Sequence, residues 1–205
     1  MANSRRLLPV LALVLIAGCT SAPPEDREDI CEIFTDKEGW YKDARRASTR
    51  WGAPIPVMMS IMYQESSFRQ RAKPPRKKIL WVIPGPRPAS AKGYAQALNE
   101  TWRAYQRATG RFGADRNHFD DAIDFIGWYI DQTHEVNGIA KTDAYSHYLA
   151  YHEGQGGFAK RTFANKGWLK DRARDVAARS DRYASQLSRC EKSLRRGWLR
   201  FLPFF

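Results

Sequence analysis

Apolar residues recur along most of this 205-residue chain at the three-to-four-residue spacing of an α-helix. Residues 54–68 form the most apolar of these segments. The segment opens with two prolines, which suit a first helical turn, and its first charged residue, Glu65, comes only near its far end. This pattern predicts a buried helix that places Glu65 close to its C-terminus.

The remaining periodic segments predict further helices that are amphipathic or partly buried. No alternating strand pattern of useful length occurs, so we expect an all-α, globular helical bundle with short connections. The expected helices span residues 38–51, 91–109, 118–136, 143–153 and 169–194. Their expected N-caps are Ser90, Asn117 and Thr142, and their expected ends are Gly52, Gly110, Gly138 and Gly154.

One connection, residues 71–89, is long for a compact domain. It holds basic and proline-rich stretches on both sides of the apolar residues 79–83. Two interpretations stand side by side. The segment is a lip that faces a substrate, with its basic residues meeting wall carboxylates and Trp81 available for a sugar face, or its apolar residues tuck into the core while the prolines stiffen its ends.

The N-terminal residues indicate export. Arg5 and Arg6 precede an apolar run at 7–17 that is too short to span a bilayer but typical of a signal peptide, predicted here as residues 1–18. The run ends at Cys19 in a sequence that resembles the bacterial lipobox, in which the cysteine becomes the acylated first residue. An ordinary secretory signal or a short anchor is the alternative. Residues 19–30 then form a lipidated tether, and Thr20 favours the outer membrane by analogy with Gram-negative lipoproteins.

Two cysteines remain once Cys19 carries lipid. Cys31 and Cys190 are an even count in an oxidising compartment, which favours a disulfide over two buried free thiols. Such a bridge would close a very long loop and contribute on the order of 4 kcal/mol by restricting the unfolded chain.

The chain is strongly basic, with a formal net charge of +12. Without residues 1–18 it keeps 32 basic and 22 acidic side chains. This excess predicts a polyanionic partner or surface, although a merely solvated basic surface has the same composition. No zinc-finger, RRM or basic-zipper pattern supports nucleic acid, and an anionic cell wall or lipid surface explains the charge as well.

Three short motifs follow one another in order: Glu-Ser-Ser-Phe at 65–68, Gly-Tyr-Ala-Gln at 93–96 and Ala-Tyr-His-Glu-Gly at 150–154. They resemble the Glu-Ser-x-Phe, Gly-Leu-Met-Gln and Ala-Tyr-Asn-x-Gly motifs of the soluble lytic transglycosylases, the lysozyme-like family that opens the peptidoglycan backbone. The second motif departs at its two central residues, and the third has His152 in the asparagine position. The interval that contains residues 71–89 is longer than is typical of the family.

The resemblance implies a goose-lysozyme-like helical domain over residues 31–205, with residues 71–89 as an insertion and Glu65 as the catalytic acid. The implied substrate-binding residues are Ser66, Gly93, Gln96, Tyr151 and His152. The resemblance places Tyr151 near Glu65, where its hydroxyl could donate to the carboxylate or the sugar, and it implies that Gly93 lets the backbone approach the cleft. Purely structural roles are the alternative for several of the site residues. Glu65 could cap its helix or pair with Arg69, Gln96 could be a surface residue, and His152 could be structural.

The chemistry of glycoside cleavage gives a separate reason to single out Glu65. A carboxylic acid must keep its proton near neutral pH, and an apolar setting raises its pKa enough to allow this. The family resembled here needs only one such acid/base. The aspartates at 120, 121, 124 and 131 predict a solvated helix face rather than a second catalytic carboxylate. The histidines show no ligand cluster, so we expect neither a metal nor a cofactor.

These observations predict a lytic transglycosylase that binds peptidoglycan glycan strands, is attached to the membrane through its N-terminal lipid, and acts as a monomer. It would lie at the periplasmic face of the outer membrane. Three alternatives stay open: a hydrolytic muramidase with the same acid, a non-catalytic peptidoglycan-binding lipoprotein, and a protein that binds nucleic acid or a membrane surface through its charge.

Overall fold

The computed structural model describes residues 21–74, 78–79, 83–84 and 90–199. Helices dominate this part of the chain, as the periodicity predicted, and no helix in it is long and apolar enough to cross a membrane. The helices are α1 (Ile30–Asp36), α2 (Trp40–Trp51), α3 (Ile55–Ser66), α4 (Asn99–Thr109), α5 (Phe119–Asn137), α6 (Ala144–Glu153), α7 (Gln155–Ala159) and α8 (Gly167–Leu199).

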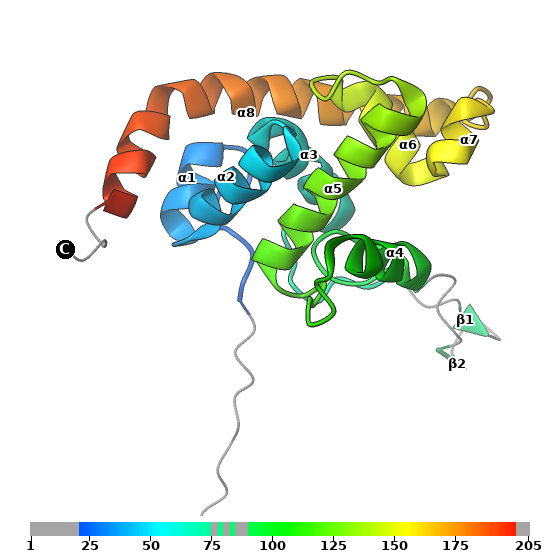
Figure 1. The fold of residues 1–205 in the computed structure, drawn as a ribbon, viewed down its shortest axis with the longest axis horizontal. Helices are drawn as coiled ribbons and strands as arrows, with labels where there is room; N and C mark the ends of the chain where they lie inside the picture. The colour runs from blue at the N-terminus through cyan, green and yellow to red at the C-terminus, as the bar shows by residue number, and fades with distance from the viewer. Residues whose placement is uncertain (1–20, 75–77, 80–82, 85–89, 200–205) are drawn as a thin grey trace, which may run out of the picture.

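The long helix α8 runs along one side of the molecule, and the shorter helices gather against it (Figure 1). α1 and α3 pack on one stretch of α8, and α6 packs on another. α5 crosses the middle, where it contacts α2, α3 and α6, and α4 packs on α5. α3 is apolar on nearly all sides because it lies at the centre of this arrangement, with Met58, Met59 and Ile61 fully buried.

The glycines predicted to end helices do follow them, but the N-caps are Leu98, His118 and Asp143 and not the predicted Ser90, Asn117 and Thr142. Gly52, Gly110 and Gly138 follow α2, α4 and α5, and each is in the left-handed conformation that glycine adopts without cost. α6 begins after Asp143, whose side chain accepts a hydrogen bond from the Ser146 N–H at 3.0 Å, so Asp143 is the N-cap and not the predicted Thr142.

The start of α4 was predicted wrongly. Residues 91–98 form a turn, closed by an isolated bridge between Lys92 and Ala97, and the helix begins only at Asn99. Tertiary packing of the turn against residue 116 overrides the helical periodicity of this segment. Ser90 still assists the helix, since its hydroxyl oxygen accepts a hydrogen bond from the Asn99 N–H at 2.9 Å.

A disulfide between Cys31 and Cys190 joins α1 to the distal part of α8, with a Cα–Cα distance of 6.1 Å. The chain just before α1 is packed as well: Glu28 forms ion pairs with Arg179 and Arg182 of α8, and Ile30 is fully buried. The residues just before α1 are therefore already packed against α8.

Within the long connection, β1 (Lys78–Ile79) pairs antiparallel with β2 (Ile83–Pro84). Trp81, which was expected either to face a substrate or to support the core, lies outside the described residues, as do the predicted signal peptide and Cys19.

Candidate active site

Glu65 lies in the last turn of α3, whose preceding residues are mostly buried. Glu65 is of intermediate exposure as a residue, and no charged group of the described residues stabilises its carboxylate. Burial raises the pKa of Glu65 from 4.5 to about 7. A carboxyl group with this pKa holds a proton for much of the time near neutral pH, as a general acid must.

The hydroxyl beside this carboxyl group belongs to Tyr148 of α6. Tyr148 is buried and donates a hydrogen bond to Glu65, which lowers the pKa of Glu65 and so opposes part of the effect of burial. Tyr151, one turn further along α6, is the tyrosine that the resemblance had placed here. The Glu65 charge is near enough to add to the rise that burial causes in the pKa of Tyr151, but the Tyr151 hydroxyl donates to the Ala95 carbonyl oxygen at 2.6 Å.

The backbone that leaves α3 is held in an unusual conformation. Ser67 (φ 50°) and Phe68 (φ 59°) are consecutive left-handed residues that are not glycine. Each such residue costs about 1 kcal/mol or more, so the surroundings must enforce it. The Ser67 N–H donates to the Tyr63 carbonyl oxygen at 2.7 Å, and the buried Phe68 ring packs against the rings of Trp40 and Tyr63. This turn fixes the end of the helix directly beyond Glu65.

Ser66, expected to contact substrate, points into the protein. It is fully buried, and its hydroxyl donates to the Met62 carbonyl oxygen at 3.2 Å. Its own carbonyl oxygen accepts a hydrogen bond from the Arg69 side chain at 2.9 Å. Ser66 therefore stabilises the end of α3 and presents no surface to a substrate, while Arg69 is held at the helix end and is not the partner of Glu65.

The segment 93–96 forms a tight turn against Arg116. Gly93 has φ 78°, and a Cβ atom there would lie 1.9 Å from the Arg116 carbonyl oxygen, so only glycine fits. This close approach is to another part of the backbone, not to a cleft as the resemblance implied. Gln96 is left-handed too, with φ 47°, and its side-chain amide donates to the carbonyl oxygens of Gly93 at 2.7 Å and Ala72 at 3.0 Å.

A small pocket of about 100 Å³ joins the second motif to the third. Gln96 lies on one side of it, and Tyr151 and Gly154 lie on the other. Glu65 meets the same stretch of α6 through Tyr148, so the structure brings residues of all three motifs into one region. The remaining residues that line the pocket are Ala97, Leu98, Thr101, Phe125 and Tyr129.

The contacts of His152 are with Trp168 and Glu153. Its exposed ring contacts the ring of Trp168 edge-on, and its Nδ1 atom is 3.0 Å from the Glu153 carboxylate. Glu153 also accepts hydrogen bonds from Lys166, at 2.8 Å to each oxygen, and from Thr162. These partners, Lys166 first, lower the pKa of Glu153 to about 2. The third motif thus supplies an ionised carboxylate that joins α6 to the start of α8. A substrate contact by His152 stays a prediction.

The acidic residues of α5 do not form the solvated face that we expected. Asp121 and Asp124 are only 7 % and 4 % exposed. Asp124 accepts hydrogen bonds from the Tyr105 hydroxyl at 2.7 Å and from the Trp51 ring nitrogen at 3.0 Å, and Arg111 lies beside both carboxylates. Buried carboxylates need such partners. They join α2, α4 and α5 and are not available as a second catalytic acid.

A group of possible metal ligands does exist, contrary to the sequence-based expectation. Side-chain atoms of His118, Asp120 and Asp121 lie within 4.8 Å of one another. Asp121 is already occupied, however, since it pairs with Arg111 and accepts a hydrogen bond from the Asp115 N–H at 2.8 Å. The group belongs to the packing of α5 and lies on a different element from Glu65.

Tyr148 is the candidate site residue that sequence reasoning missed. It precedes Tyr151 by three residues, so the two side chains lie on the same face of α6. An orientation of α6 that brings Tyr151 toward Glu65 also brings Tyr148 toward it. The three-residue spacing of the two tyrosines was therefore the signal that could have identified Tyr148.

A helical domain with a glutamate of raised pKa at the end of its central helix is consistent with a lysozyme-like fold and a candidate acid at Glu65. A family model described as the transglycosylase SLT domain matches residues 7–190. The chain therefore belongs to the transglycosylase SLT family, which supports peptidoglycan as its substrate and lytic transglycosylase activity in general. A comparison with curated proteins gave no match.

Proposed function

We propose that this protein cleaves the bond between N-acetylmuramic acid (MurNAc) and N-acetylglucosamine (GlcNAc) in peptidoglycan and leaves a 1,6-anhydro ring on MurNAc. The observation that carries the proposal is the setting of Glu65. Its pKa of about 7 supplies a proton at neutral pH, and no charged group of the described residues holds it permanently ionised.

The reaction needs two proton transfers through this one carboxyl group. Glu65 first donates its proton to the glycosidic oxygen as the bond to the MurNAc anomeric carbon breaks, and GlcNAc leaves with a new hydroxyl group. The carboxylate then takes the proton from the MurNAc 6-hydroxyl, whose oxygen bonds to the anomeric carbon and closes the ring. The proton on Glu65 is restored, and no water is consumed.

A single acid is consistent with the state of the buried carboxylates of α5 and α6. A hydrolase that uses two carboxyl groups needs a second one free to activate water or attack the sugar. Glu153 is bound by Lys166 and Thr162, and Asp124 is bound by Tyr105 and Trp51. The substrate's own 6-hydroxyl therefore takes the place of the second group.

Product analysis tests this function. The chain without residues 1–19 should release fragments from purified sacculi that end in 1,6-anhydroMurNAc, seen by mass spectrometry as the loss of one water relative to a reducing end. Reducing MurNAc ends would instead identify a hydrolytic muramidase. The absence of any fragment would favour a non-catalytic wall-binding protein and refute the proposal.

We also propose that lipid on Cys19 anchors the protein at the periplasmic face of the outer membrane. The apolar run at 7–17 ahead of Cys19 and the neutral Thr20 after it support this location. Cys19→Ala should block incorporation of a fatty-acid probe and processing of the leader, whereas Thr20→Ala should leave both intact. Equal labelling of the Cys19→Ala protein and its parent would exclude this anchor.

A further inference from the structure

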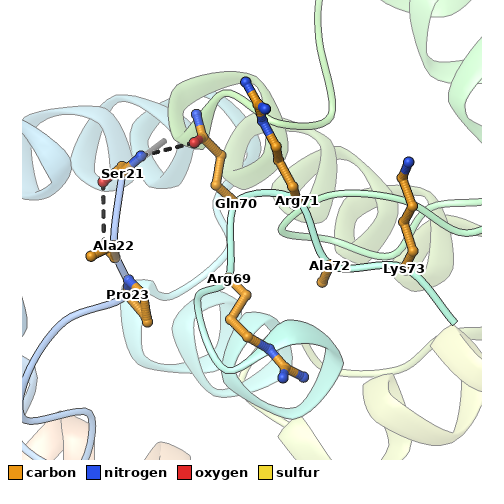
Figure 2. A pocket seen from close by; sticks show the side chains of 8 residues that line it. All are labelled: Ser21, Ala22, Pro23, Arg69, Gln70, Arg71, Ala72 and Lys73. Carbon is orange, nitrogen blue, oxygen red and sulfur yellow. Dashed lines mark hydrogen bonds between the residues drawn. The ribbon is translucent and has the colours of Figure 1, made fainter. Parts of the chain in front are cut away.

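A basic pocket of about 540 Å³ lies where the chain leaves α3 (Figure 2). One wall is the segment 69–73, and the other is the segment 21–23, close to the predicted lipidation site. The walls are held together by a hydrogen bond from the Ser21 N–H to the Gln70 side-chain oxygen at 2.9 Å. The lining residues are Ser21, Ala22, Pro23, Arg69, Gln70, Arg71, Ala72 and Lys73.

Two cations of this pocket have no partner in the described part of the chain. Arg71 and Lys73 are exposed, and neither forms an ion pair or hydrogen bond with a described residue. Their side chains extend to the same side of the segment, whereas that of Arg69 points to the opposite side, where it bonds to Ser66 (Figure 2). Two like charges on one side of a short loop repel each other, and a bound anion relieves that repulsion.

The pocket is joined directly to the candidate active site. Ala72, between the two cations, uses its carbonyl oxygen to accept hydrogen bonds from the Gly93 N–H at 2.9 Å and from the Gln96 side-chain amide at 3.0 Å. Gln96 in turn lines the small pocket that contains Tyr151. A ligand bound by Arg71 and Lys73 would therefore lie beside the backbone of residue 72, which also holds the turn of the proposed glycan site.

We propose that the basic pocket binds free carboxylates of the peptide stem that branches from MurNAc. This inference rests on the proposed function, because it assigns a subsite to the same substrate. The glycan backbone itself offers hydroxyl and acetamido groups, whereas the stem carries carboxylates that guanidinium and ammonium groups bind through charge-assisted hydrogen bonds. The pocket selects glycan strands that still carry their peptides.

The variant that tests this is Arg71→Gln/Lys73→Gln. Its matched control is Arg189→Gln/Lys192→Gln, which removes the same two kinds of charge from an exposed part of α8. Each is assayed on peptide-bearing strands and on the same strands after their stem carboxylates have been converted to neutral amides. The pocket variant should raise KM on peptide-bearing strands by about tenfold with kcat unchanged, equivalent to about 1.4 kcal/mol, while the control matches the parent. On the amidated strands all three proteins should be alike.

Binding measurements separate this subsite from the catalytic proposal. In a Glu65→Gln background, affinity for peptide-bearing sacculi should fall on removal of Arg71 and Lys73 even if no cleavage is ever observed. The inference is overturned if the pocket variant binds and cleaves peptide-bearing strands like the parent, or if its loss is equal on the amidated strands. It is also overturned if the variant loses only its binding to phosphatidylglycerol vesicles, which would assign the pocket to lipid headgroups beside the anchor.

Discussion

Two glutamates lie at the C-terminal ends of two neighbouring helices, α3 and α6, and their surroundings shift their pKa values in opposite directions. Glu65 ends the apolar helix α3 with only the Tyr148 hydroxyl to stabilise its charge, and its pKa is about 7. Glu153 ends α6 among Lys166, Thr162 and His152, and its pKa is about 2. The same residue type is thus a proton donor at one helix end and a fixed anion at the other.

This contrast shows how the catalytic acid can be recognised among the carboxyl groups of the protein. Burial raises the pKa of both groups, but it is the largest influence on Glu65, whereas hydrogen bonds from Lys166 and Thr162 outweigh it at Glu153. The two sites also differ in their cations. Lys166 forms an ion pair with the Glu153 carboxylate, and no charged group of the described residues stabilises the Glu65 carboxylate. Two carboxyl groups whose pKa values are pushed apart in this way can be assigned to different tasks.

The largest expected effect is on turnover. Glu65→Gln should lower kcat on sacculi by about a hundredfold or more, because the amide keeps the shape of the side chain but cannot supply the proton. Glu153→Gln makes the same chemical change at the other helix end and should retain most of the activity. Equal losses of kcat in the two variants would contradict the different roles of the two glutamates.

The second effect is on the free energy of unfolding, which Glu65→Gln and Glu153→Gln should change in opposite directions. The pKa of Glu65 is raised by folding, so its ionisation destabilises the folded state. This cost is absent below pH 4.5, grows as pH rises toward 7 and is complete above it. Glu65→Gln should therefore stabilise the protein above pH 7, by on the order of 3 kcal/mol at most, and change little at pH 4.

Glu153 should behave in the reverse manner. Its pKa is lowered by folding, so its contribution to stability is present above pH 4.5 and is lost as pH falls toward 2. Glu153→Gln should lower the free energy of unfolding at pH 7, with a smaller loss at pH 3. Urea unfolding of both variants at several pH values checks the pair, and a Glu65→Gln protein that is less stable than its parent at pH 8 would contradict the account.

The smallest effect concerns Tyr148. Its hydrogen bond favours the ionised form of Glu65, so Tyr148→Phe should raise the pKa of Glu65 and move the alkaline fall of kcat/KM to higher pH. Tyr129→Phe is the matched control, because its hydroxyl donates to the Ala150 carbonyl oxygen at 3.2 Å instead. A shift toward lower pH in Tyr148→Phe would show that the hydroxyl does not stabilise the charge.

Local sequence signals predicted much of this molecule. The glycines that end α2, α4 and α5 could be identified because the left-handed conformation favours glycine wherever it occurs. The buried helix and its terminal Glu65 could be predicted because apolar residues on all sides leave no solvated face. The family patterns then placed Gln96 and Tyr151 close to one pocket.

What the sequence did not predict depends on tertiary contacts. The turn at 91–98 exists because Gly93 packs on the Arg116 backbone, and nothing in the local periodicity records that contact. Asp124 looked solvated because its partners, Tyr105 and Trp51, come from other helices. The partner of Glu65 was mistaken for a similar reason, since only the orientation of α6 decides which tyrosine hydroxyl reaches the carboxyl group.

The most direct test is the titration of the two carboxyl groups themselves. Carbon-13 NMR of protein labelled at the glutamate side-chain carboxyl, with signals assigned by their loss in Glu65→Gln and Glu153→Gln, follows each group separately. The account predicts a Glu65 midpoint near pH 7 and a Glu153 signal that stays ionised down to about pH 2. A Glu65 midpoint at the ordinary value near 4.5 would contradict the claim that folding prepares this residue as the acid.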